Sequence, residues 1–128
     1  MDALTAGRLL RLGAALAAVG VAVGAFGAHG LRPRITPERL AVFESGVQYH
    51  GVHALGLLAV AWAAHAAPQA AGPRWAGALF AVGILLFSGS LYALVLTGVT
   101  LWGAVTPFGG LAFIAGWLAL ATTRLPRA

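Results

Sequence analysis

The sequence contains no cysteine and no lysine, and only three of its 128 residues are acidic. The absence of cysteine excludes disulfide bonds, thiol catalysis and cysteine-ligated metal sites, and it leaves the redox compartment open. Charged residues make up 9% of the chain, whereas an ordinary soluble domain has about 25%. So few charged side chains cannot cover the surface of a soluble domain, which argues against a soluble enzyme.

Hydrophobic residues, by contrast, make up 60% of the chain and gather in long uncharged runs. A bilayer crossing takes about 20 helical residues, and the runs predict crossings at about 9–28, 47–67, 75–97 and 107–123. The runs are rich in Ala and Leu and do not alternate with a period of two, which argues against strands. The predicted fold is therefore an all-α integral membrane four-helix bundle, formed by a single transmembrane domain over 1–128.

The first run also admits a second interpretation. Arginines followed by an apolar run and small residues are typical of a signal peptide, and Ala25-Phe26-Gly27 could serve as its cleavage site. The run is longer than the 7–15 or so apolar residues of a typical signal peptide. This length favours a retained helix.

The segment between the first two crossings has the signals of a helix start. Thr36 is a suitable cap, Pro37 fits the first helical position, and Glu38 lies near the positive end of the helix dipole. Ile35 and Leu40 stand at the two positions of a hydrophobic staple. The pattern predicts a short interfacial helix between crossings one and two, or an extended first turn of the second crossing.

The positive charge, which is +5 in total, comes from eight arginines at the edges of the apolar runs. This placement is typical of a membrane protein and not of a nucleic-acid-binding protein, which would need a clustered basic patch. With four crossings, both termini lie on one side of the membrane. That side collects five arginines against three, which predicts cytoplasmic termini.

A few polar residues lie within or near the apolar runs, where such side chains usually point inward. They define a candidate polar pocket made of His29, Gln48, Tyr49, His50, His53, Ser88 and Ser90. A cluster of this kind could relay protons, hold a metal or ligate haem. Because the chain has no spaced metal-ligand motif, we expect these residues to hydrogen-bond between helices, with no metal, no cofactor and no catalytic residue.

Glycines recur at spacings that allow close helix packing. Gly20 and Gly24 form a small-xxx-small motif of the GxxxG type, which is common in membrane helices and therefore of low specificity. The predicted packing positions are Gly20, Gly24, Gly27, Gly46, Gly89, Gly109 and Gly110.

Several short motifs together resemble a known family. They are GAFGAHGL at 24–31, GVQYH at 46–50 followed by HAL at 53–55, FSGSLY at 87–92, TPFGG at 106–110 and GW at 116–117. The resemblance is to the small membrane proteins catalogued as domain of unknown function 423, the YgdD-like and transmembrane protein 256-like proteins, and it covers nearly the whole chain. It implies four transmembrane helices in a bacterial inner membrane, or in an organellar membrane in eukaryotes. It implies no enzymatic activity, because the family has none assigned.

Three functions are consistent with these features. The first is a structural or accessory membrane protein that packs against itself or a larger membrane complex, with the lipid bilayer as its surroundings and no nucleic-acid partner. The second is a binding module whose polar pocket takes a lipid headgroup, a quinone or a metal. The third is a small transporter or channel, which would require an oligomer because one copy is too thin to enclose a pathway.

Overall fold

The computed structural model describes residues 3–127, and this part of the chain contains helices and no strand. The all-helical prediction is confirmed for these residues, which leave out 1–2 and 128 of the predicted domain. In chain order the elements are α1 (Ala3–Phe26), the π-helical turn η1 (Gly27–Leu31), α2 (Pro37–Ala66), α3 (Ala71–Gly83), the π-helical turn η2 (Ile84–Ser88), α4 (Gly89–Thr97), the 3₁₀ turn η3 (Thr100–Ala104) and α5 (Thr106–Ala121).

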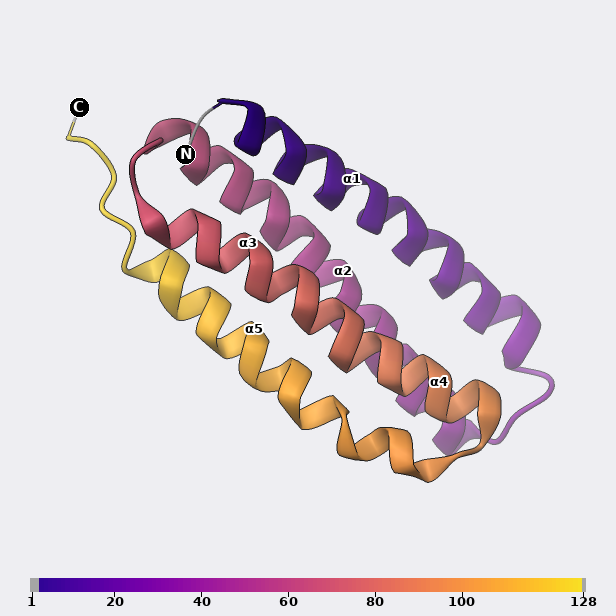
Figure 1. The fold of residues 1–128 in the computed structure, drawn as a ribbon. Helices are drawn as coiled ribbons and strands as arrows, with labels where there is room; N and C mark the ends of the chain where they lie inside the picture. Colours follow the sequence, from indigo (N-terminus) through magenta and orange to yellow (C-terminus); the bar gives the residue numbers. More distant parts are fainter. Residues whose placement is uncertain (1–2, 128) are drawn as a thin grey trace.

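These elements form rods that run up and down beside one another (Figure 1). The turn η1 continues α1, and α3, η2 and α4 together form one rod from Ala71 to Thr97. Both ends of the described chain lie at the same end of the bundle, together with the connection between α2 and α3 (Figure 1). The connection between α1 and α2 and the turn η3 lie at the opposite end.

Among residues 3–127, three helical segments are long and apolar enough to cross a membrane: Thr5–Leu31, Ala71–Thr97 and Thr100–Ala121. The helix α2 is not one of them, although it has 30 residues. Its histidines, with Gln48 and Tyr49 beside them, make it more polar than the other rods. It nevertheless holds the central place, because α1 packs against it and so do α3 and α4, while α5 packs mainly against α3.

Local signals in the sequence account for where the helices begin and end. The hydroxyl of Thr36 accepts a hydrogen bond from the backbone N–H of Arg39 at 3.3 Å, and Pro37 occupies the first turn of α2. Pro107 likewise lies in the first turn of α5. Gly98 ends α4 in the left-handed conformation, with φ of 72° and its N–H bonded to the carbonyl of Leu94.

The separate interfacial helix is not found among the described residues. The segment between Leu31 and Pro37 is a turn, and α2 continues unbroken from Pro37 to Ala66. The second interpretation of this segment, an extended first turn of α2, therefore describes the chain. The start of α2 is held in place by Arg39, whose guanidinium donates to the carbonyl of Val95 near the end of α4.

The interior divides into two apolar clusters along α2. The larger lies toward the chain ends and contains Leu57, Val60, Ala76, Phe80, Ile84 and Phe113. The smaller lies at the other end and contains Leu31, Phe43 and Val95, with Ile35 and Leu40 packed against it. The predicted staple residues thus both contact this smaller cluster. Buried polar side chains occupy the stretch of α2 between the two clusters.

Candidate functional site

His50 joins three rods at the middle of α2. Its Nε2 donates to the carbonyl of Leu16 in α1 at 2.8 Å, because a carbonyl oxygen can only accept. Its Nδ1 lies 3.0 Å from the hydroxyl of Tyr92 in α4, which donates to it in the neutral ring. The ring lies beside Gly20 of α1, where a Cβ would be in ordinary contact with it at 3.5 Å. Both ring nitrogens therefore have partners on neighbouring helices.

His53 lies one turn further along α2 and faces α5. Its Nδ1 donates to the carbonyl of Tyr49 at 2.7 Å, and its Nε2 accepts from the indole N–H of Trp117 at 3.0 Å. Because an indole can only donate, Nε2 carries no proton and Nδ1 does. The imidazole also stacks on Phe113, with ring centroids 3.4 Å apart and planes within 7°. His53 is thus a neutral hydrogen-bonded ring within an aromatic layer.

The two buried serines of the third rod complete this set of contacts. Ser88, which is fully buried at the end of η2, donates to the carbonyl of Gly46 in α2 at 2.6 Å. Ser90 donates to the carbonyl of Phe87 at 2.9 Å, and its hydroxyl lies 2.6 Å from that of Thr106 at the start of α5. Serine side chains therefore connect α4 and η2 both to α2 and to α5.

The predicted polar pocket is only partly brought together. His50, His53, Ser88 and Ser90 are buried, but they point to different neighbouring helices. Tyr49 is 44% exposed, with its ring packed 4.6 Å from that of Phe87. Gln48 is exposed on the outer side of α2.

The expectation that His29 joins these residues is wrong, because its side chain is exposed. From Thr5 onward, the buried positions of the first rod are Ala6, Gly13, Gly20, Gly27 and Leu31. The first four recur every seven residues and mark the face that packs on α2. At about 100° per residue, a position two residues after Gly27 lies on the opposite face of the rod. His29 therefore points away from α2.

Most of the predicted packing glycines lie where two helices approach closely. A Cβ on Gly27 would lie 2.9 Å from the ring of Phe43, one on Gly24 would lie 3.3 Å from Val47, and one on Gly46 would lie 2.8 Å from the ring of Tyr92. Gly109 lies against the backbone of Phe87.

Three of the predicted glycines differ from this pattern, and one of them is Gly20, where a Cβ would be in ordinary contact with the ring of His50. Gly110 has only ordinary contacts, at 3.9 Å and beyond. Gly89 has nothing nearer than 4.0 Å, and that atom is a carbonyl oxygen of its own rod, that of Ile84. Gly89 is therefore not a close-packing position.

Sequence reasoning missed several close helix approaches and the hydrogen bond between Trp117 and His53. A Cβ on Gly13 would lie 3.0 Å from the carbonyl oxygen of Ala54, and Gly56, Gly77 and Gly83 also lie against neighbouring helices. The heptad spacing of Gly13, Gly20 and Gly27 was the available signal for the first of these. No pattern pointed to the bond between Trp117 and His53, because it depends on how α5 is turned.

The buried polar side chains of the described residues are all hydrogen-bonded. Within residues 3–127, every buried side-chain nitrogen or oxygen has a hydrogen-bond partner. No three His, Asp or Glu side chains of this described part gather closely enough to hold a metal ion. The buried histidines of α2 therefore hydrogen-bond to neighbouring helices.

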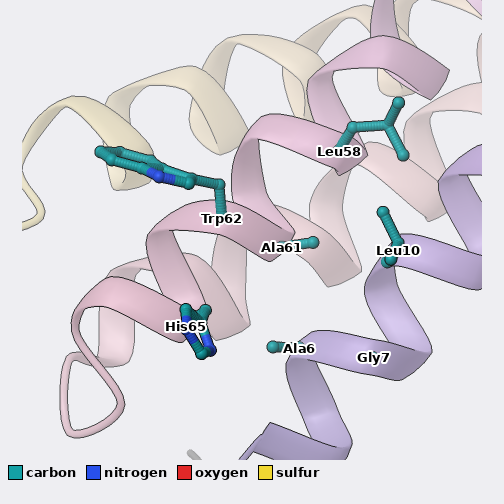
Figure 2. A pocket seen from close by; sticks show the side chains of 7 residues that line it. All are labelled: Ala6, Gly7, Leu10, Leu58, Ala61, Trp62 and His65. Carbon is teal, nitrogen blue, oxygen red and sulfur yellow. The ribbon is translucent and has the colours of Figure 1, made fainter.

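A hollow of about 380 Å³ lies elsewhere, between α1 and α2 near the chain ends (Figure 2). Its walls are mainly apolar, with Trp62 and His65 as the polar side chains, and the full lining is Ala6, Gly7, Leu10, Leu58, Ala61, Trp62 and His65. None of the residues of the predicted polar pocket contributes to it.

Comparison with known proteins connects the chain to a family of membrane proteins. The family described as "Protein of unknown function (DUF423)" matches residues 23–110. The UPF0382 membrane protein YwdK of Bacillus subtilis is 50% identical over 107 residues, which cover 84% of this chain and 87% of YwdK. The UPF0382 inner membrane protein YgdD of Escherichia coli K12 is 40% identical over 97 residues, 76% of this chain and 73% of YgdD.

A third relative is the UPF0382 membrane protein SH2409 of Staphylococcus haemolyticus, which is 44% identical over 109 residues, 85% of this chain and 88% of SH2409. No solved structure matches the chain. The matched region includes the buried polar residues of α2 and η2 and the start of α5. The resemblance seen in the sequence motifs is confirmed, and the chain belongs to the DUF423 family, a family of membrane proteins of unknown function.

Proposed function

We propose that this chain is a structural or accessory protein of the cell inner membrane, that it crosses the bilayer four times, and that it is not an enzyme. In this proposal the polar residues of α2 hold the bundle together, and the outer surface of the bundle packs against other membrane proteins or a second copy of the chain. The observation that carries the proposal is the pairing of every buried polar side-chain atom of the described residues within the chain itself. A ligand site would require donors or acceptors left for the ligand.

The fourth crossing in this proposal is α2. The helix has 30 residues and lies between α1 and the rod formed by α3, η2 and α4, both of which are apolar enough to span. Its two buried polar side chains, His50 and His53, point toward neighbouring helices. Between Glu44 near its start and His65 near its end, the exposed polar side chains are Ser45, Gln48 and Tyr49, and Ser45 donates to the carbonyl of Ala41. Internal hydrogen bonds offset the cost of placing imidazole and hydroxyl groups in the bilayer.

The proposed orientation places both termini in the cytoplasm. The end of the bundle that carries the termini holds Arg8, Arg11, Arg74, Arg124 and Arg127. The other end holds Arg32, Arg34 and Arg39, and one of these is paired, since Arg32 lies 3.7 Å from Glu44. The excess of arginine at the first end supports a cytoplasmic location for it.

The proposal is tested by purifying the full-length protein in mild detergent and measuring its absorption spectrum, metal content and thermal unfolding. His53→Asn keeps a polar side chain but removes the imidazole, and His65→Asn is a matched control on the exposed end of α2. We expect no stoichiometric metal or chromophore, a lower unfolding temperature for His53→Asn, and no change for His65→Asn. A stoichiometric metal, quinone or haem that His53→Asn abolishes while the unfolding temperature stays constant would overturn the proposal.

A further inference from the structure

The outer side of α2 carries an amide that no residue of the described chain satisfies. Gln48 is exposed, and its side chain forms no hydrogen bond with any residue of the described chain 3–127. The buried side of α2 is marked by His50, His53 and Leu57. At about 100° per residue, Gln48 lies opposite the mean direction of these residues. The amide therefore points outward from the bundle.

Gln48 also lies within the apolar part of the molecule. It is one turn further along α2 than Glu44, and no Asp, Glu, Lys or Arg follows in this helix. The neighbouring residues Val47 and His50 lie against Gly24 and Gly20 of α1. These glycines belong to the charge-free stretch between Arg11 and Arg32, about 12 Å or more from either arginine at 1.5 Å per residue. Lipid chains at this level offer the amide no partner.

We propose that Gln48 lies at a parallel twofold contact between two copies of this chain, in which α2 packs against α2 of the second copy. An amide has both donors and an acceptor, so two copies of the same amide can satisfy each other across a twofold axis. Two copies inserted with the same orientation present Gln48 at the same depth, and this makes a second copy a complementary partner. The inference rests on the proposed structural function and names the face and the partner that this function would use.

The residues around Gln48 fit such a contact. Exposed side chains follow it at intervals of four and three residues along one stripe of α2, namely Val52, Leu55, Ala59 and Trp62. This is the spacing at which two parallel helices pack side by side, and one polar residue in such a seam sets its register. Beside the stripe, a shallow hollow of about 400 Å³ between α1 and α2 is lined partly by Gly20, Gly24 and Gly51 and can receive partner side chains.

Cysteine cross-linking tests the contact without background, because the chain has no cysteine of its own. Val52→Cys places a thiol on the stripe. Leu85→Cys is the control, because Leu85 is 71% exposed on η2 and lies near the same depth, three residues before the Ser88 that bonds to Gly46. In native membranes under mild oxidation, we expect disulfide-linked dimers for Val52→Cys and few or none for Leu85→Cys. Equal cross-linking of the two variants, or none for Val52→Cys, would overturn the proposal.

Substitution of Gln48 tests the role of the amide. Gln48→Leu removes it and Gln48→Asn keeps it, and both lie on an exposed surface where the fold should tolerate them. Loss of an interhelical hydrogen bond should weaken dimerisation by about 3- to 20-fold for Gln48→Leu, measured by energy transfer between labelled copies in vesicles, with Gln48→Asn closer to the native protein.

An equal affinity for the native protein and Gln48→Leu would contradict the role of the amide. If the native protein is a monomer, and His53→Asn lowers the unfolding temperature without loss of a bound ligand, the dimer contact is overturned and the proposed function stands. A ligand bound at His53 would overturn the proposed function and leave the dimer contact standing.

Discussion

The indole nitrogen of Trp117 and Nε2 of His53 lie 3.0 Å apart, and this hydrogen bond connects α5 with α2. The helix α5 otherwise packs mainly against α3. The bond belongs to an aromatic layer in which His53 stacks on Phe113 and Trp117 lies 4.7 Å from the ring of Phe80. Within this layer, the imidazole of His53 stacks as a phenylalanine ring could, and its two nitrogens also form hydrogen bonds that a phenylalanine could not form.

Two adjacent glycines at the start of α5 provide a matched comparison of packing. A Cβ on Gly109 would overlap the backbone of Phe87, whereas one on Gly110 would lie 3.9 Å from the ring of Phe87. We therefore predict that Gly109→Ala lowers the free energy of unfolding by about 1–3 kcal/mol, as overpacking does. Gly110→Ala should leave it unchanged or slightly raised, because alanine is the better helix former.

Thermal unfolding in detergent and accumulation of a fluorescent fusion in the membrane measure both glycine variants. Gly109 and Gly110 are adjacent in α5 and receive the same substitution, so any general effect of alanine on helix stability is common to both variants and drops out of the difference between them. Similar losses of stability for Gly109→Ala and Gly110→Ala would show that α5 does not lie against η2 as described.

A second comparison concerns the contact between α1 and α2. A Cβ on Gly13 would lie 3.0 Å from the carbonyl oxygen of Ala54, which is backbone and cannot move aside, whereas one on Gly20 would lie 3.5 Å from the ring of His50. We predict that Gly13→Ala destabilises the protein by about 1–3 kcal/mol and that Gly20→Ala has little effect. The measurement is thermal unfolding, and a larger loss for Gly20→Ala would contradict the placement of α1.

The proposed orientation predicts the behaviour of reporter fusions. Because the arginine-rich end carries both termini, a green fluorescent protein fused to the C-terminus should fluoresce and alkaline phosphatase fused there should be inactive. Alkaline phosphatase inserted between Leu31 and Pro37, in the turn at the other end, should be active. Active phosphatase at the C-terminus would reverse the orientation, and reporters on different sides at the two termini would contradict four crossings.

Local sequence rules predicted the start of α2 well. The cap at Thr36 and the proline at Pro37 act through the backbone of their immediate neighbours. Such effects are readable from a few consecutive residues. The rule for a helix start could not distinguish a short separate helix from the first turns of α2. That distinction depends on whether the helix is interrupted before the apolar run that follows.

The site was predicted less fully, because it depends on how each helix is turned about its axis. Burial of polar residues at membrane depth was a sound expectation for His50, His53, Ser88 and Ser90. The sequence pattern alone did not show that His29 lies on the far face of its rod. The partners of the histidines, Leu16, Tyr92 and Trp117, are 34, 42 and 64 residues away along the chain. Contacts over such separations follow from tertiary packing.

The central claim is that the buried polar side chains bond helix to helix, and a double-mutant cycle on His53 and Trp117 tests it most directly. Trp117→Phe removes the indole N–H but keeps a ring, and His53→Leu removes the acceptor. We predict that the free energies of unfolding of the two single variants and the double variant give a favourable coupling of about 0.6–1.7 kcal/mol, which lies between the mean and the maximum found for hydrogen bonds between membrane helices. Additive effects of the two substitutions, with no coupling, would contradict the account.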